Sequence, residues 1–149
     1  MQLCFDFDRV PVEAVVLPPA KRHAGRQTVR QTRGQMAYQS GRMAEMTVAD
    51  RYLAAGYKLV AQRWRGKAGE IDVILKKDAL LVFVEVKSSR DFARAAERIS
   101  RRQMDRICMA ACEYCGTLPA SQMTEMRMDA AFVDRFGRVE IIEAAFGAQ

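Results

Sequence analysis

The chain has 149 residues, which is enough for one hydrophobic core and too few for two domains of ordinary size. Half of its residues are hydrophobic and 28% are charged, as in a globular protein rather than a disordered or fibrous one. The net charge of +6 and the isoelectric point near 9.4 favour a polyanionic partner such as nucleic acid.

From the sequence we expect neither a membrane protein nor a secreted protein. No apolar run approaches the roughly 18–20 residues that are needed to span a bilayer. The N-terminus carries Asp6 and Asp8 and has no basic segment ahead of an apolar stretch, so it does not resemble a signal peptide. We therefore expect a cytoplasmic protein, in which the four cysteines are reduced thiols.

The first 38 residues differ from the rest of the chain. Prolines interrupt their beginning, and five basic residues occur without an acid between residues 19 and 35: Lys21, Arg22, Arg26, Arg30 and Arg33. We predict a flexible basic arm over residues 1–38, followed by a single domain over residues 39–149. Such an arm can follow a nucleic-acid backbone through its charge. The alternative is an unstructured tail or a wrongly assigned start.

A first helix is expected from about residue 42 to residue 55, with Gly56 as its C-terminal cap. Glu45 falls within the apolar face of this helix, which is formed by Met46, Val48, Ala49, Tyr52 and Leu53. A carboxylate on the core-facing side needs a partner, a metal ion or a proton. Two interpretations of Glu45 stay open, namely a functional acid and a buried hydrogen bond or ion pair.

Residues 69–87 are the most informative segment, because charged residues interrupt two apolar strands there. A strand over residues 57–64 precedes them. The strand over residues 70–75 contains Asp72, and the strand over residues 80–87 contains Glu85 and Lys87. Side chains alternate along a strand, and a two-residue turn makes the numbers of paired residues sum to an odd value. Asp72 and Glu85 then share a face and lie roughly 4.5–8 Å apart.

Two carboxylates at that separation repel each other unless a cation compensates them. Either a bound divalent cation or the neighbouring Lys87 supplies the compensation. Carboxylate oxygens with no His or Cys nearby favour Mg²⁺ or Mn²⁺ over Zn²⁺. The alternative is that Asp72 and Glu85 are solvated charges at strand ends, since an Asp ahead of a Glu-x-Lys also arises by chance.

Arg63, Trp64 and Arg65 lie between the first two strands, next to the proposed metal site. Arginine can clamp a phosphate group, and an exposed tryptophan can stack on an unpaired base. We therefore predict nucleic-acid contact at these three residues, with phosphate bound by at least one arginine. The alternative places Trp64 in the core and leaves both arginines solvated.

A second main helix begins after an arginine-rich loop. Ser100 followed by Gln103 is a capping-box pattern that marks its start, and Gly116 ends it. Three cysteines at residues 108, 112 and 115 raise the question of an iron–sulfur cluster. Core packing is favoured, because two of them fall in the apolar stripe of the helix, which is formed by Met104, Ile107, Cys108, Ala111 and Cys115. Strands over residues 127–133 and 139–142 complete the sheet.

The sequence GEIDVILKKDALLVFVEVKSSR, residues 69–90, resembles the signature of the YraN-like family of bacterial predicted endonucleases. The resemblance extends over residues 41–146, and its most specific part is the pairing of GEID with FVEVK. This family belongs to the PD-(D/E)xK superfamily. The resemblance implies an α/β fold with the restriction-endonuclease-like αβββαβ core, in which helices flank a mixed β-sheet.

The resemblance also assigns roles to residues. It implies that Asp72 and Glu85 are metal ligands, that Lys87 is the active-site lysine and that Glu45 is the acid of the first helix, which would bind a second ion or order a water. Gln103 stands where the family often has lysine, so one phosphate contact is lost.

These observations predict a metal-dependent nuclease that hydrolyses DNA, including branched or processed structures. Asp72, Glu85 and the backbone carbonyl of Val86 would hold Mg²⁺ or Mn²⁺. One alternative is a non-catalytic nucleic-acid-binding module that acts with a partner. Another is a protein-interaction subunit whose basic surface meets an acidic protein. A homodimer is compatible with the nuclease, because paired cuts often require two active sites.

Overall fold

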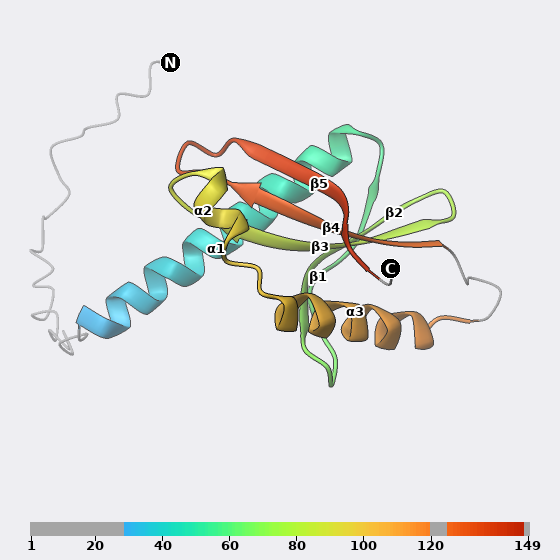
Figure 1. Ribbon diagram of the computed structural model, residues 1–149. Helices are drawn as coiled ribbons and strands as arrows, with labels where there is room; N and C mark the ends of the chain where they lie inside the picture. Colours follow the sequence, from blue (N-terminus) through green and yellow to red (C-terminus); the bar gives the residue numbers. More distant parts are fainter. Residues whose placement is uncertain (1–28, 120–124, 148–149) are drawn as a thin grey trace, which may run out of the picture.

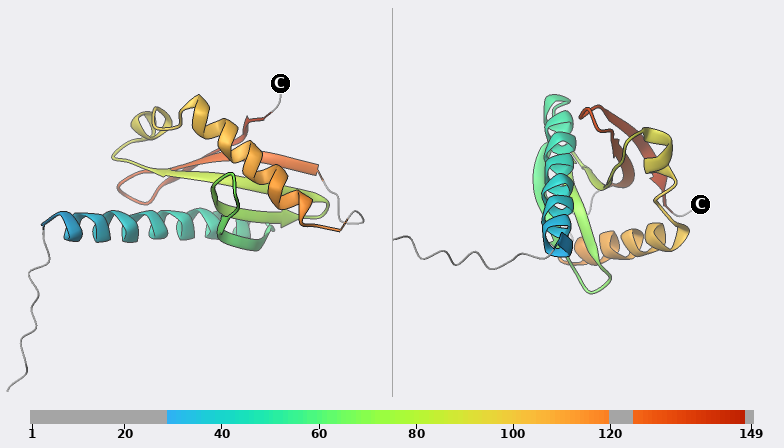
Figure 2. Two further views of the ribbon diagram at one scale, coloured as in Figure 1. Left: turned by 90° about the horizontal axis from the view of Figure 1, so that it is seen from below. Right: turned by 90° about the vertical axis from the view of Figure 1, so that its left-hand side faces the viewer.

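The computed structural model describes residues 29–119 and 125–147, which form a three-layered α/β sandwich (Figure 1). A five-stranded sheet in the order β1-β2-β3-β4-β5 has α1 on one face and α2 and α3 on the other (Figure 2). The elements are α1 (Val29–Ala54), β1 (Lys58–Arg65), β2 (Glu70–Lys77), β3 (Leu80–Ser88), α2 (Phe92–Ala96), α3 (Arg101–Gly116), β4 (Glu125–Val133) and β5 (Val139–Phe146).

The sheet is mixed, as predicted. Strands β3 and β4 are parallel, whereas the pairs β1–β2, β2–β3 and β4–β5 are antiparallel. A parallel pair needs a crossover connection, and α2 and α3 supply it on one face of the sheet. This arrangement agrees with a restriction-endonuclease-like core and confirms the predicted fold class. No helix within the described ranges is both long and apolar enough to cross a membrane.

Helix α1 begins at Val29 and not near residue 42. Residues 29–40 are all exposed, so no apolar periodicity marks this part of the helix in the sequence. The last ten residues of the predicted arm, 29–38, therefore belong to α1, and residues 1–28 lie outside the described residues. The predicted apolar face is also narrower than expected, because Met46 and Leu53 are exposed.

The C-terminus of α1 matches the prediction at Gly56. The N–H of Tyr57 donates to the carbonyl of Tyr52 at 3.1 Å, and the N–H of Gly56 donates to the carbonyl of Leu53 at 3.0 Å. These bonds define a Schellman motif, and Gly56 has the left-handed φ of 89° that the motif requires. The rings of Tyr52 and Tyr57 meet edge to face at 5.2 Å, so the cap also supplies an apolar contact.

Strands β2 and β3 form the predicted hairpin. Pairs from Val73↔Val84 to Lys77↔Leu80 have residue numbers that sum to 157, which is the expected odd value. The two-residue turn is Asp78-Ala79, with a left-handed φ of 52° at Asp78. Because the side-chain period of a strand is two, this register places Asp72 and Glu85 on one face of the sheet.

Apolar side chains fill both faces of the sheet. Val48 and Tyr52 of α1 pack with Val73, Val82 and Val84 on one face. On the other face, α3 packs on a second cluster, and α2 packs with the ends of β4 and β5 on a third. Phe83 is fully buried in the cluster beneath α3. The central strands β2 and β3 therefore cannot shift without disturbing the cores on both faces.

A buried carboxylate joins α1 to the far half of the sheet. Asp129 is fully buried and accepts hydrogen bonds from the hydroxyl of Tyr52 at 2.7 Å and from Arg127 Nε and Nη2 at 2.9 Å each. It also accepts the N–H of Ala144, at 3.0 Å. Burial and the hydrogen bond to Asp129 raise the pKa of Tyr52, so its hydroxyl stays protonated. Arg127 and Asp129 of β4 thus have a structural role.

Candidate functional site

The candidate site begins where the β2–β3 ladder stops. Val73↔Val84 is the last pair of this ladder, and the next residues in the same register are Asp72 and Glu85. The N–H of Val86 donates to Asp72 Oδ2 at 2.8 Å. A side-chain oxygen therefore takes a bond that a strand would ordinarily make with its neighbour's backbone. This bond fixes the Asp72 carboxylate against the C-terminal part of β3.

Glu85 lies between a lysine and an amide. It is only 4% exposed, and its Oε1 atom lies 2.8 Å from Lys87 Nζ. The same oxygen accepts a hydrogen bond from Gln103 Nε2, at 2.5 Å. Asp72 comes from β2, Lys87 from β3 and Gln103 from the first turn of α3, so the site joins three elements of the fold.

The carboxylates of Asp72 and Glu85 repel each other. Burial, together with the nearby charge of Glu85, raises the pKa of Asp72 to about 7, and the N–H of Val86 opposes the shift. Lys87 compensates only part of this negative charge. Burial and repulsion destabilise the ionised form of Asp72, and a bound cation would stabilise that form.

The donors that remain suit a hard divalent ion. Among the described residues, no hydrogen bond reaches Asp72 Oδ1 or Glu85 Oε2. These same residues contain no group of three or more His, Cys, Asp or Glu side chains that could hold a metal. Mg²⁺ is commonly bound by one or two carboxylates and completed by water and substrate phosphate, so two carboxylates fit it and do not fit a closed Zn²⁺ site.

Glu45 is buried on α1, as its position in the sequence implied, and it forms an ion pair. Arg63 Nε donates to Glu45 Oε2 at 2.7 Å, and Arg63 Nη2 donates to Oε1 at 2.9 Å. These bonds raise the pKa of the Arg63 guanidinium above its already high value. Of the two interpretations left open by the sequence, the structure has the ion pair.

The side chains of Trp64 and Arg65, the other two residues of the Arg-Trp-Arg segment, lie in different surroundings. Trp64 is half-buried against the cluster under α3, where its ring meets Tyr114 edge to face at 5.4 Å. Arg65 is largely exposed and pairs with Glu70 at 2.8 Å. The indole is thus partly covered, whereas the Arg65 guanidinium faces solvent.

Sequence reasoning missed the contact between Gln103 and Glu85. The Ser100–Gln103 pattern predicted a reciprocal capping box, and half of it forms, since Ser100 Oγ accepts the N–H of Gln103 at 3.3 Å. The amide of Gln103 does not return to Ser100 and donates to Glu85 instead. The available signal was the place of Gln103 at a position where the YraN-like family often has a polar lysine.

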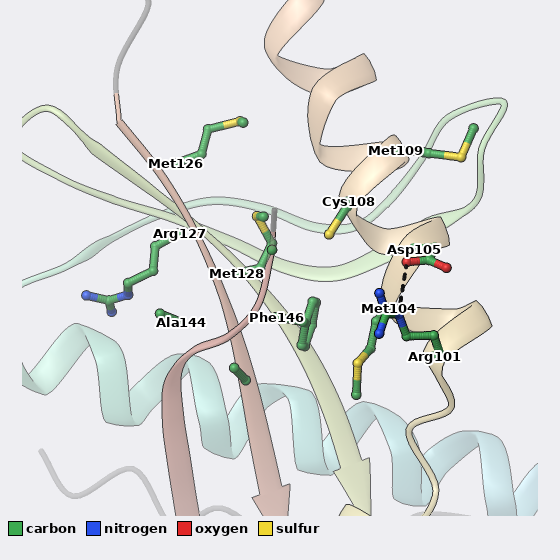
Figure 3. A pocket seen from close by; sticks show the side chains of 12 residues that line it. Arg101, Met104, Asp105, Cys108, Met109, Met126, Arg127, Met128, Ala144 and Phe146 are labelled. Atoms are coloured by element: carbon green, nitrogen blue, oxygen red, sulfur yellow. Dashed lines mark ion pairs between the residues drawn. The ribbon is translucent and has the colours of Figure 1, made fainter. Parts of the chain in front are cut away.

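Two hollows lie along α3. One, of about 820 Å³, runs between α3 and the ends of β4 and β5, and Figure 3 shows Cys108 and Met128 on its two walls. It contains none of the candidate site residues. The other, of about 730 Å³, is open to solvent and is lined by Arg102, Gln103 and Arg106. Gln103 links this second hollow to Glu85.

The helix cysteines pack less deeply than predicted. Cys108 and Cys115 are half-buried and Cys112 is exposed. Burial raises the pKa of the Cys108 and Cys115 thiols, which favours their protonated form. Part of the predicted apolar stripe therefore borders the larger hollow and lies outside the core.

Comparison with known proteins gives one consistent result. Residues 44–141 match the sequence model of the family described as "Uncharacterised protein family UPF0102". A UPF0102 protein of Ruegeria pomeroyi is 51% identical over 116 residues, 78% of this chain and 94% of that protein. A UPF0102 protein of Cereibacter sphaeroides is 50% identical over 115 residues, covering 77% and 98% of the two chains. One from Roseobacter denitrificans is 49% identical over 112 residues, covering 75% and 87%.

Proposed function

The chain belongs to the uncharacterised protein family UPF0102, the YraN-like family, and we propose that it is a metal-dependent nuclease acting on phosphodiester bonds in DNA. One observation carries the proposal: Asp72 and Glu85 lie side by side at the end of the β2–β3 ladder, with Lys87 against Glu85. Two carboxylates with an ammonium group can hold a divalent ion beside a phosphate.

Asp72, Glu85 and the backbone carbonyl of Val86 would hold Mg²⁺ or Mn²⁺. The bound ion would polarise a phosphoryl oxygen and lower the pKa of a water molecule. The chain fixes both carboxylates in advance, since the N–H of Val86 holds Asp72 and the Gln103 amide holds Glu85. Such fixing reduces the reorganisation needed when substrate binds.

Lys87 would act on the phosphate or on the attacking water. Its ammonium group lies 2.8 Å from Glu85 Oε1 and its side chain is 23% exposed, so it can reach both the site and a bound substrate. A cation at this place would stabilise the negative charge that develops on the phosphoryl oxygens. It would also hold a water molecule in position by hydrogen bonding.

A DNA strand would approach over the open hollow beside α3. Arg102 and Arg106 line this hollow next to Gln103. Arg65 projects into solvent from β1, where an exchange of its partner Glu70 for phosphate costs little. The net charge of +6 supports attraction of a polyanion to this surface. A homodimer or another protein partner is compatible with this approach.

A second candidate function is DNA binding without cleavage. Two observations favour it: Glu45 is already paired with Arg63, and Gln103 replaces the lysine that the family often has. A module of this kind would bind duplex or branched DNA in a salt-dependent way and would release no cleaved product.

A cleavage panel distinguishes the two functions. Duplex, single-stranded, flapped and branched DNA are incubated with the protein and Mg²⁺ or Mn²⁺. The parent is expected to cut at least one substrate, and Asp72→Asn, Glu85→Gln and Lys87→Met are expected to lose cleavage and to keep most DNA retention. Glu140→Gln, which changes an exposed acid of β5, is the control and should cut like the parent. Equal cleavage by parent and Asp72→Asn would refute the nuclease assignment.

A further inference from the structure

We propose that Arg63 acts as a resident cation for Glu45, so that the site takes up one divalent ion and not two. This inference rests on the proposed metal-dependent function and departs from the resemblance, in which the acid of the first helix is free to bind a second ion. In this chain that acid is held by a residue of β1. Arg63 is therefore a positioning residue, and the single ion belongs to Asp72 and Glu85.

The first support is that both oxygens of Glu45 are engaged. Arg63 Nε and Nη2 donate to them at 2.7 and 2.9 Å in a bidentate pair. The Glu45 side chain is 10% exposed and that of Arg63 is 27% exposed, so water screens the pair only in part. A planar guanidinium in this geometry satisfies a carboxylate more completely than a single ammonium does.

The second support is that Arg63 is anchored at several points. Its φ of 49° lies in the left-handed region, which a non-glycine residue adopts only when its surroundings require it. Its guanidinium lies 4.6 Å from the ring centroid of Tyr38, and that ring comes from α1, the same helix as Glu45. Arg63 is thus held at its backbone, at its guanidinium face and at its hydrogen-bonding edge.

The third support is the position of Arg63 beside the metal site. Its neighbours pair across to β2 as Gln62↔Val73 and Trp64↔Ile71, so Arg63 stands opposite Asp72 in that register. The bidentate pair holds Glu45 at Arg63, so the acid of α1 lies over this part of β1 and β2. The position next to Asp72 that a second ion would occupy is therefore already supplied with a positive charge.

The balance of charge separates the two positions. Glu45 and Arg63 neutralise each other, whereas Asp72 and Glu85 share one lysine and keep a net negative charge when ionised. An ion entering at Glu45 would have to displace a bidentate guanidinium and leave it part-buried without a partner. An ion entering at Asp72 and Glu85 meets two carboxylate oxygens, Asp72 Oδ1 and Glu85 Oε2, that accept no hydrogen bond from the described residues, so it breaks no ion pair.

Isothermal titration calorimetry of the full chain with Mn²⁺ tests the inference without using activity. The parent is expected to bind one ion per chain. Arg63→Gln, which frees Glu45, is expected to gain a second and weaker ion. Arg65→Gln is the matched control, because it removes another arginine of β1 that is paired with a glutamate, and it should still bind one ion. Asp72→Asn should bind none.

The double variant Glu45→Gln with Arg63→Gln removes both charges together and keeps the test decisive if Arg63→Gln alone does not fold. It is expected to bind one ion within about twofold of the parent affinity, and a tenfold loss would overturn the inference, because Glu45 would then be a ligand. Two ions in the parent would overturn the inference and leave the proposed function standing. A second site that fails to appear in folded Arg63→Gln also overturns it. No binding in the parent would overturn both.

Discussion

The Asp72→Asn variant tests the electrostatics of the site in the absence of metal. Asparagine keeps the shape of the side chain and an oxygen that accepts the N–H of Val86. It removes the negative charge that Glu85 repels. Burial and Glu85 raise the pKa of Asp72 from 3.8 to about 7 in the folded protein. In EDTA, we therefore expect the variant to be more stable than the parent at pH 8.

The sign follows from proton binding. Between about pH 4 and pH 7 the unfolded chain has released the proton of Asp72 while the folded chain retains it, so the parent loses stability as pH rises through this window. A shift of about three units corresponds to an upper bound of about 4 kcal/mol, at 1.36 kcal/mol per unit. Asp72 is partly exposed, and solvent screening reduces this value.

Urea unfolding followed by circular dichroism, between pH 5 and pH 8, measures the effect. The difference in free energy of unfolding between Asp72→Asn and the parent should grow with pH and level off above pH 7. Glu140→Gln should show no such growth. Adding Mg²⁺ at pH 8 should stabilise the parent and leave Asp72→Asn unchanged. A difference that stays constant across the pH range would refute the reasoning.

Three further predictions concern other parts of the molecule. Asp129→Ala should lower the free energy of unfolding by about 3–5 kcal/mol in urea titrations, because it leaves the buried hydroxyl of Tyr52 without its acceptor and takes from Arg127 its buried carboxylate partner; a loss below 1 kcal/mol would contradict this role. Ser100→Ala should cost about 1 kcal/mol through loss of the α3 cap, measured in the same way, and unchanged stability would count against the cap. Lys87→Met should keep Mn²⁺ binding by calorimetry while cleavage falls by at least a hundredfold, and cleavage at the parent rate would show that the ammonium group is dispensable.

Regular local patterns explain why much of the site was predictable. The side-chain period of a strand is two, so a two-residue turn was enough to place Asp72 and Glu85 on one face. Gly56 and Ser100 marked helix ends because capping depends on the residue at the cap and its nearest neighbours. These features involve residues that are close together in the chain.

The first half of α1 shows where such patterns fail. Residues 29–40 are exposed throughout, so their helical conformation leaves no apolar stripe in the sequence, and the helix was predicted to begin near residue 42. Helical propensity alone is a weak guide to an exposed segment, since a stretch of this length is marginally stable without packing or continuation into a longer helix.

The sequence by itself therefore determined the mixed α/β fold, the register of the β2–β3 hairpin and the placement of Asp72 and Glu85 on one face of the sheet. The tertiary structure alone decided which partners the charged groups take. Arg63 meets Glu45 because β1 and α1 pack together, and Gln103 meets Glu85 because α3 begins above β3. Each of these contacts joins residues 18 positions apart in the chain. The distance in space between the paired side chains is set by how the helices pack on the sheet. No local periodicity or capping pattern in the sequence encodes that packing.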